Sequence, residues 1–179
     1  MRDWDRPWWM AGGWAIDAFT GTARAHEDID IAIFRDDVPG LRSYLGQEWN
    51  CWAAGDGALT PLTEARPGLP AAADQCWVRA HAWSPWVADV VTSPGSERQW
   101  VLKRDTSVTM PLDDAIRAYE GIAYQRPEIV LAYKAKLVRA KDDADLARTW
   151  PLLDARARAW PQDTVALVHP GHRWLSRSR

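Results

Sequence analysis

Two aspartates, Asp28 and Asp30, stand two residues apart in the segment DIDIAIF. The polar–apolar alternation and the β-branched residues of this segment predict a strand over residues 28–34. Residues i and i+2 of a strand point to one face, so the two carboxylates project together while Ile29 and Ile31 point to the core. Two carboxylates this close repel unless a cation neutralises them or one of them stays protonated. Mg²⁺ suits the pair, because it binds one or two carboxylates together with substrate phosphates.

The pair Gly12-Gly13 precedes the aspartates and joins a predicted buried strand at residues 7–11 to a predicted helix at residues 14–19. Glycines at such a junction let backbone N–H groups approach a phosphate, and the start of the helix adds a positive end. A phosphate cradle followed by a carboxylate pair is what nucleotidyl transfer needs, since its catalysis consists mainly of positioning and charge stabilisation. Either motif alone is weak evidence, whereas the ordered set of strand, glycines, helix, loop and DxD is specific.

The motifs GGWAID (residues 12–17) and RAHEDIDIAIF (residues 24–34) closely resemble the aminoglycoside 2''-adenylyltransferase type of antibiotic nucleotidyltransferase and the lincosamide nucleotidyltransferases. This family falls within the DNA-polymerase-beta-like nucleotidyltransferases. The close match covers about residues 7–35, and looser resemblance lies in residues 127–146 and in the tail HPGHRWL. Nothing is recognised between residues 45 and 87, so the antibiotic acceptor does not transfer with the motif.

The resemblance implies that Asp28 and Asp30 bind two Mg²⁺ ions, and that a third acid on a neighbouring strand binds metal and can act as the base. Asp89 in WVADVVTS is the best candidate, because an unpaired charge between apolar strand neighbours would otherwise be costly. The alternative is an aspartate at a strand edge that faces water. Asp56 and Asp74 lie in turn-like sequence and are poorer candidates.

We expect the nucleotide triphosphate to lie on Gly12 and Gly13, with Arg24 and Lys134 as further contacts. Lys134 lies on the apolar face of a helix predicted from residues 127 to 139, together with Val130, Tyr133, Leu137 and Val138. A buried lysine needs an anionic partner, either a carboxylate or a triphosphate. We expect the triphosphate, and we expect Lys136 to point to solvent.

The remaining charged residues near these motifs have mainly structural interpretations. In the polar loop before the DxD, Arg24 could touch phosphate, and His26 could be a hydrogen-bonding residue or a base. Asp17 in the helix after the glycines is interpreted as structural. Ion pairs between helices are predicted for Arg139, Lys141, Asp142 and Asp145.

Composition narrows the class of partner. The chain has 22 Lys and Arg against 24 Asp and Glu, for a net charge of −2. Nucleic-acid binders are usually basic, so this balance argues against a DNA or RNA substrate and leaves a small polar acceptor open. No signal peptide and no apolar run of ~18 residues is present, so we expect a cytoplasmic protein with no membrane partner. Cys51 and Cys76 have no metal-ligand spacing and are expected to be free thiols.

Tryptophan is unusually frequent, with 13 residues against 2 phenylalanines. Two interpretations stay open. The rings fill core that Phe or Leu would fill elsewhere, or some of them line a site for a flat or sugar-like ligand.

The order of predicted elements is strand, helix, strand, helix, then strands, then helices. After residue 34 we expect a helix at 38–45, strands at 51–53, 75–82, 86–92, 98–102 and 121–124, and helices at 127–139, 142–150 and 154–168. This order predicts an α/β protein with a mixed β-sheet nucleotidyltransferase core (residues 1–110), on which helices pack, followed by a small helical C-terminal part (residues 111–179). The family has a helix before the first strand, for which the six residues before Pro7 leave no room. Either the gene start is placed too late, or the core lacks this helix.

These observations predict a magnesium-dependent enzyme that transfers NMP from an NTP, with ATP as the default donor, to a hydroxyl of a small polar acceptor and releases pyrophosphate. An aminoglycoside-like antibiotic is one such acceptor, which would make antibiotic resistance the biological role. The alternatives are a nucleotidyltransferase that acts on tRNA or protein, and a catalytically degenerate relative that only binds nucleotide. The sequence leaves the acceptor, the donor base and the oligomeric state open.

Overall fold

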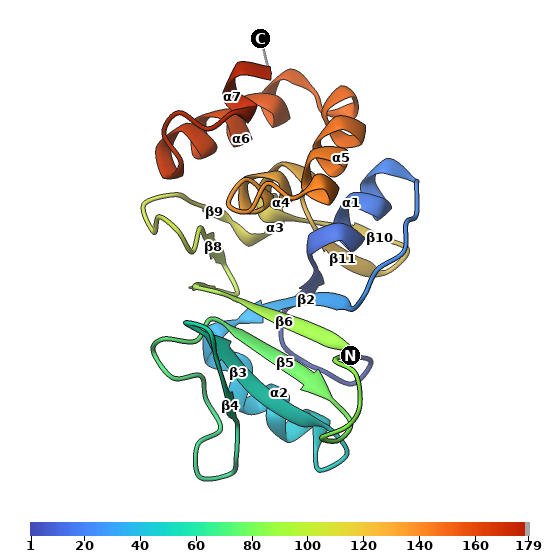
Figure 1. Ribbon diagram of the computed structural model, residues 1–179, viewed down its shortest axis with the longest axis vertical. Coiled ribbons are helices and arrows are strands. Elements are labelled where there is room, and N and C mark those ends of the chain that lie inside the picture. Colours follow the sequence, from blue (N-terminus) through green and yellow to red (C-terminus); the bar gives the residue numbers. More distant parts are fainter. Residues whose placement is uncertain (178–179) are drawn as a thin grey trace.

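A computed structural model describes residues 1–177 of the chain (Figure 1). Its centre is a mixed sheet of eight strands. In spatial order these strands are β10 (Ile116–Tyr119), β11 (Ile122–Gln125), β1 (Trp8–Met10), β2 (Ile29–Phe34), β6 (Ala88–Ser93), β5 (Gln75–Arg79), β3 (Asn50–Gly55) and β4 (Ala58–Pro61). A second sheet of three short strands contains β7 (Gly95–Ser96), β8 (Gln99–Val101) and β9 (Thr109–Pro111).

Seven α-helices surround the sheets within the described residues: α1 (Gly12–Thr20), α2 (Val38–Leu45), α3 (Leu112–Ala115), α4 (Pro127–Lys134), α5 (Ala140–Thr149), α6 (Ala155–Val168) and α7 (Trp174–Arg177). Two 3-10 turns, η1 (Arg35–Asp37) and η2 (Trp150–Leu152), precede α2 and follow α5. No helix of the described chain is long and apolar enough to span a bilayer. The predicted architecture, a mixed α/β core with a helical C-terminal part, is confirmed.

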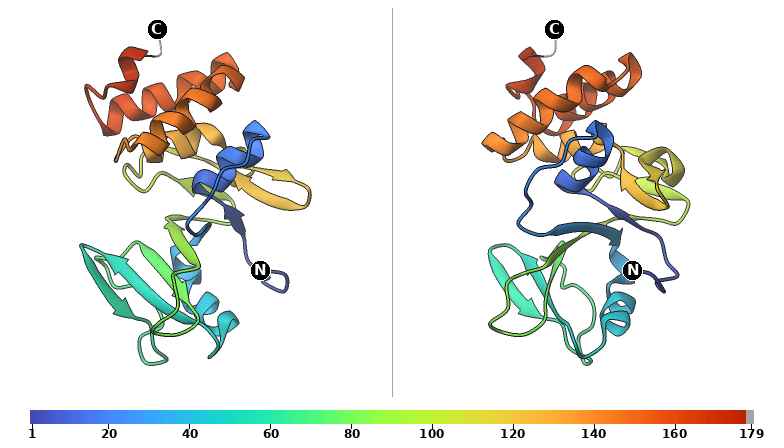
Figure 2. Two further views of the ribbon diagram at one scale, coloured as in Figure 1. Left: turned by 45° about the vertical axis from the view of Figure 1, so that its right-hand side comes forward. Right: turned by 90° about the vertical axis from the view of Figure 1, so that its right-hand side faces the viewer.

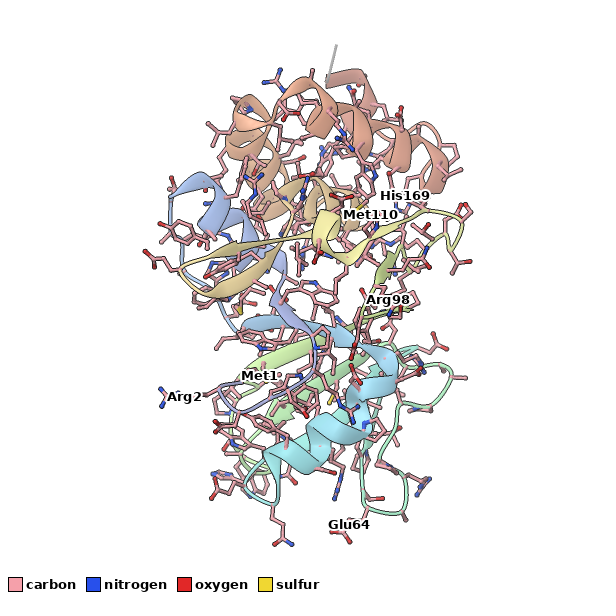
Figure 3. All side chains as sticks on the ribbon, turned by 180° about the vertical axis from the view of Figure 1, so that it is seen from behind. Met1, Arg2, Glu64, Arg98, Met110 and His169 are labelled. Carbon is pink, nitrogen blue, oxygen red and sulfur yellow. The ribbon has the colours of Figure 1, made fainter. Side chains whose placement is uncertain are left out.

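The molecule has two halves that share the middle of the large sheet. Strands β3 to β6 and α2 lie at one end, and α4 to α7 lie at the other end with α1 and the β10–β11 hairpin (Figures 1 and 2). Seen from behind, α2 lies against the strands (Figure 3). Val38 and Leu41 of α2 pack there on Val90, Cys76 and Val78. The division at residue 110 stays a prediction, and β10 and β11 join the main sheet from beyond it.

The strand and the helix predicted at the N-terminus both form, but the helix begins at Gly12, so the glycine pair is part of it instead of preceding it. Strand β1 lies between β2 and β11, and α1 begins at Gly12 directly after it. Gly12 has a φ of 54°, a left-handed conformation that favours glycine. At the other end of α1 the N–H of Gly21 bonds to the oxygen of Asp17 at 2.9 Å, which ends the helix as expected.

Several predictions about elements and about buried residues were wrong in detail. The helix predicted to run to residue 139 ends at Lys134, and Leu137 is 61% exposed instead of lying on the apolar face. The cause is distant in sequence, because the Arg104 guanidinium caps the carbonyls of Ala132 (3.0 Å) and Tyr133 (2.9 Å).

Ile29, expected in the core, is 41% exposed because it is the first residue of β2. The segment after residue 53, expected to be a loop, contains β4. Strand β10 was also not predicted.

Candidate active site

The sheet places two of the predicted acids side by side. Strand β2 pairs with β6 in parallel, and in this register Asp30 lies directly opposite Asp89. Asp28 immediately precedes β2, where its backbone oxygen accepts a 2.8 Å hydrogen bond from the Trp14 indole. We call these three side chains the carboxylate row. The prediction that Asp89 lies on a strand next to Asp30 is confirmed, and its role as metal ligand or base stays a prediction.

Electrostatics within the carboxylate row disfavour full ionisation. Burial, together with the neighbouring Asp30 and Asp28 carboxylates, raises the pKa of Asp89 to about 7. Burial also raises the pKa of Asp30, with Asp28 as the second cause, while Lys134 opposes the shift. Asp89 accepts one hydrogen bond from the Gln75 amide (2.7 Å), but its other oxygen, Oδ1, is buried without a partner. Such an orphaned anionic oxygen is expensive unless a cation joins it.

The glycine pair closes the row on its other side. A Cβ built on Gly12 would lie 2.0 Å from the Asp30 Oδ2 atom, so only glycine permits this contact. A Cβ on Gly13 would lie 2.1 Å from the Arg24 guanidinium and 2.6 Å from the His26 ring. The structure therefore brings together Gly12, Gly13 and Arg24, which the sequence analysis placed around a phosphate, and it adds His26, which was interpreted as a hydrogen-bonding residue or a base.

Behind the glycines lies a second group of acids, each of which forms at least one ion pair. Lys134, on the buried end of α4 as predicted, bridges Asp145 (2.8 Å) and Asp142 (3.2 Å) of α5. Arg148 contacts Asp145 (2.8 Å) and Asp17. We call Asp17, Asp142 and Asp145, together with their cations, the ion-pair network. The carboxylates of α5 thus supply the anionic partner that a buried Lys134 requires, and its contact with a nucleotide stays a prediction.

The loop residues before the row are anchored to this network. Asp17 accepts from the backbone N–H of Arg24 (3.0 Å) and pairs with His26 (2.7 Å), which confirms its structural role. The His26 ring also stacks on Trp14 with centroids 4.4 Å apart. The Arg24 side chain lies 3.6 Å from Asp145 and is 28% exposed. This anchoring holds Arg24 and His26 over Gly13.

Within residues 1–177, no three His, Cys, Asp or Glu side chains converge as a ready-made metal site. The Asp30 carboxylate lies against Gly12, and Asp89 turns one oxygen to Gln75. The chemistry of the donors nevertheless fits a hard divalent cation. Asp30 and Asp89 offer oxygen ligands on adjacent strands, and Asp28 offers another just before β2. One of these oxygens is orphaned, and burial together with neighbouring carboxylates raises the pKa values of Asp30 and Asp89.

Sequence reasoning missed Gln75 and Lys103. Gln75 is the first residue of β5 and donates a hydrogen bond to Asp89. Lys103 forms an ion pair with Asp74 at 2.9 Å, and its charge lowers the pKa of Asp89. Neither residue carries a motif, and only the register of β5 on β6 and the fold of the loop after β8 bring them near the row.

Comparisons with known proteins agree with the resemblance of the motifs and with the fold. The family model described as aminoglycoside-2''-adenylyltransferase matches residues 1–50. The fold is similar to the crystal structure of ANT(2'')-Ia in complex with adenylyl-2''-tobramycin, with a TM-score of 0.57 and 15% identity over 91% of this chain and 89% of that one. The solution structure of ANT(2'')-Ia gives a TM-score of 0.57 and 13% identity over 97% of this chain and 87% of that one.

A third similar structure is that of the lincosamide antibiotic adenylyltransferase LnuA with lincomycin bound, with a TM-score of 0.53 and 13% identity over 82% of this chain and 87% of that one. No curated protein sequence matches the chain. Over its first 50 residues the chain thus matches the aminoglycoside 2''-adenylyltransferase family, as its motifs predict, and it has the fold of these nucleotidyltransferases.

Proposed function

We propose that this protein is a magnesium-dependent nucleotidyltransferase that transfers NMP from an NTP, with ATP as the default donor, to a hydroxyl of a small acceptor. The observation that carries the proposal is the placement of Asp30 opposite Asp89 beside Gly12, with a buried Asp89 oxygen that has no partner. Matched motifs in residues 1–50 and the fold of two adenylyltransferases support it.

In this reaction Asp28, Asp30 and Asp89 would hold the divalent cations. When bound, these cations neutralise charge on the triphosphate and on the leaving group. The backbone N–H groups at Gly12 and Gly13 and the Arg24 guanidinium bind phosphate oxygens. Lys134 contributes positive charge from beneath the site, although two carboxylates share it.

Asp89 is the candidate base for the proton transfer, because its Oδ1 atom has no hydrogen-bond partner within the described residues. It accepts the proton of the acceptor hydroxyl as that oxygen attacks the α-phosphorus. A P–O bond forms to the acceptor, the bond between the α-phosphorus and the bridging oxygen breaks, and pyrophosphate leaves with that oxygen. The products are the nucleotidylated acceptor and pyrophosphate.

The acceptor class follows the structural relatives. One of them was solved with adenylyl-2''-tobramycin and another with lincomycin, so antibiotics that carry sugar hydroxyls are the first acceptors to test.

The test is pyrophosphate release from each NTP with Mg²⁺, measured with tobramycin, lincomycin and simple polyols. The Asp28→Asn protein is the negative control, and Asp113→Asn, which alters an exposed carboxylate on α3, is the matched control. Release that needs both an acceptor and Asp28 supports the proposal. Equal release by wild type and Asp28→Asn would refute the metal assignment, and no release with any acceptor would refute a small-molecule transferase.

A further inference from the structure

The row of side chains that holds Asp30 and Asp89 continues across the sheet. Asp89 on β6 lies opposite Trp77 on β5, and Trp77 lies opposite Trp52 on β3. Directly opposed residues carry their side chains on the same face of a sheet. Two tryptophans therefore extend the carboxylate row on its side away from Gly12.

This face is the one that α2 does not cover. Cys51 and Ala53 of β3 and Cys76 and Val78 of β5 belong to the core against α2. Because side chains alternate along a strand, Trp52 and Trp77 point to the opposite face. The ribbon shows α2 behind these strands and no described helix in front of them (Figure 1).

A third ring completes the feature that we call the tryptophan platform, which consists of Trp52, Trp77 and Trp86. The Trp86 ring meets Trp77 edge-on at 5.4 Å and Trp52 at 6.4 Å. Arg79, two residues after Trp77, places its guanidinium over the rings of Trp86 (4.3 Å) and Trp52 (5.0 Å). Two indoles thus hold one cation in a fixed position on the tryptophan platform.

The three rings of the platform do not belong to the hydrophobic core. All three rings are only half-buried, and none of them belongs to or packs against the three core clusters, whereas Trp9 and Trp100 are fully buried in one.

The polar atoms of the platform are incompletely bonded. The Trp77 indole N–H and the Arg79 Nε lack a hydrogen-bond partner, as does the Asp89 Oδ1. Arg79 donates to the Ala82 carbonyl (2.9 Å), and among residues 1–177 no carboxylate forms an ion pair with it. The unpaired Trp77 N–H and Arg79 Nε are buried and cannot reach a ligand, but the ring faces and the Arg79 charge, which no described carboxylate pairs, are features of a binding site for a polar ring.

We propose that the tryptophan platform is the acceptor subsite, and that it takes a hydroxylated ring of a glycoside whose substituents near Arg79 are neutral or anionic. The inference rests on the proposed function. With the triphosphate on Gly12 and Gly13 and the reacting hydroxyl at Asp89, the rest of the acceptor must extend away from the glycines. The side chain next to Asp89 in that direction is Trp77.

Arg79 determines which glycosides fit. A fixed cation repels an ammonium group most strongly where little water screens it. A polyamine such as tobramycin would bring several positive charges to this surface, whereas lincomycin brings a single basic nitrogen. The indole rings therefore favour ring-shaped acceptors by stacking. The Arg79 charge disfavours polycationic acceptors by repulsion.

The test measures binding of lincomycin and tobramycin by calorimetry without nucleotide, so that it does not depend on transfer activity. The variants are Trp52→Leu and Arg79→Glu. The matched control is Trp49→Leu, which removes a half-buried indole that packs on the α2 side of the sheet.

We expect wild type to bind lincomycin more tightly than tobramycin, and Trp52→Leu to weaken lincomycin binding by about tenfold. Trp49→Leu should leave this affinity unchanged, which separates lost stacking from a general loss of folding. Arg79→Glu should reverse the preference in favour of tobramycin.

Unchanged lincomycin binding by Trp52→Leu would overturn the platform, and so would tighter tobramycin binding by wild type. If the wild-type protein bound neither lincomycin nor tobramycin, the assignment of a glycoside as the ligand would be overturned. Because pyrophosphate release tests the transferase independently, Asp28-dependent release together with an inert platform would reject only the subsite.

Discussion

The carboxylate row and the ion-pair network are neighbouring groups of aspartates with opposite electrostatics. In the network, Asp17 and Asp142 have lowered pKa values, because hydrogen bonds and charges from His26, Arg148, Arg139 and Lys134 outweigh burial. In the row, Asp30 and Asp89 have raised pKa values, because burial and the neighbouring carboxylates act together. Within residues 1–177, the fold thus places Lys and Arg side chains in contact with the carboxylates of the ion-pair network, but not with those of the carboxylate row.

This difference teaches where a cation from outside belongs. A network that is complete without ligands stabilises the helices, whereas a row that lacks positive charge stores unfavourable energy in the free protein. Binding of a divalent ion removes this unfavourable energy. The acids of the ion-pair network are already neutralised by protein cations, so an added ion would stabilise them little. Substitutions in the two groups should therefore have opposite effects.

The largest effect is expected in the rate of transfer. Asp30→Asn should lower kcat/KM for nucleotidyl transfer by about a thousandfold or more, because it removes the central oxygen ligand of the row. The measurement is steady-state pyrophosphate release with the best acceptor. If Asp30→Asn lost less than about tenfold while Asp113→Asn matched wild type, the row would not be the catalytic centre.

The second effect is on stability and concerns the network. Asp145→Asn should lower the free energy of unfolding by about 3 kcal/mol, because it leaves the buried Lys134 and Arg148 undercompensated. For a chain of this size that corresponds to a fall in Tm of roughly 6 to 12 °C. Differential scanning calorimetry measures it, and a Tm within a degree or two of wild type would show that the network contributes little.

The third and smallest effect is a pH-dependent gain in the free energy of unfolding when Asp89 of the carboxylate row is replaced by Asn. The folded pKa of Asp89, about 7, lies above its unfolded value near 3.9. The folded state therefore binds more protons between these values, and its stability falls as pH rises towards 7. Asp89→Asn removes this penalty and should raise metal-free stability by on the order of 1 kcal/mol at pH 8.

The gain from Asp89→Asn should shrink towards pH 5, where the wild-type carboxyl is mostly protonated. Thermal unfolding in EDTA at the two pH values measures it, with Asp113→Asn as the control. A gain of the same size at both pH values, or a loss at pH 8, would contradict a buried carboxylate that lacks a cation.

The sequence predicted the parts of the site that depend on local order. The DxD at Asp28 and Asp30, the glycine pair and the start of α1 are contiguous motifs, and the strand around Asp89 follows from its apolar neighbours. Helical periodicity placed Lys134 on the buried face of its helix. A buried lysine requires an anion, but the periodicity left a carboxylate and a triphosphate as alternatives.

What the sequence did not predict depends on pairing between distant segments. Arg104 ends α4 early by capping it from another loop. The alignment of Trp52 and Trp77 with Asp89 depends on the register of β3, β5 and β6, which no motif encodes. The abundance of tryptophan was visible, but only the structure separates the core rings, such as Trp9 and Trp100, from the platform.

The most direct test of the central claim, that the carboxylate row is a metal site, is Mn²⁺ binding followed by electron paramagnetic resonance with a non-hydrolysable ATP analogue present. Wild type and Asp113→Asn should bind Mn²⁺ with the same affinity, Mg²⁺ should displace it, and Asp30→Asn should weaken it by about tenfold or more. Equal Mn²⁺ affinity in wild type and Asp30→Asn would contradict the account.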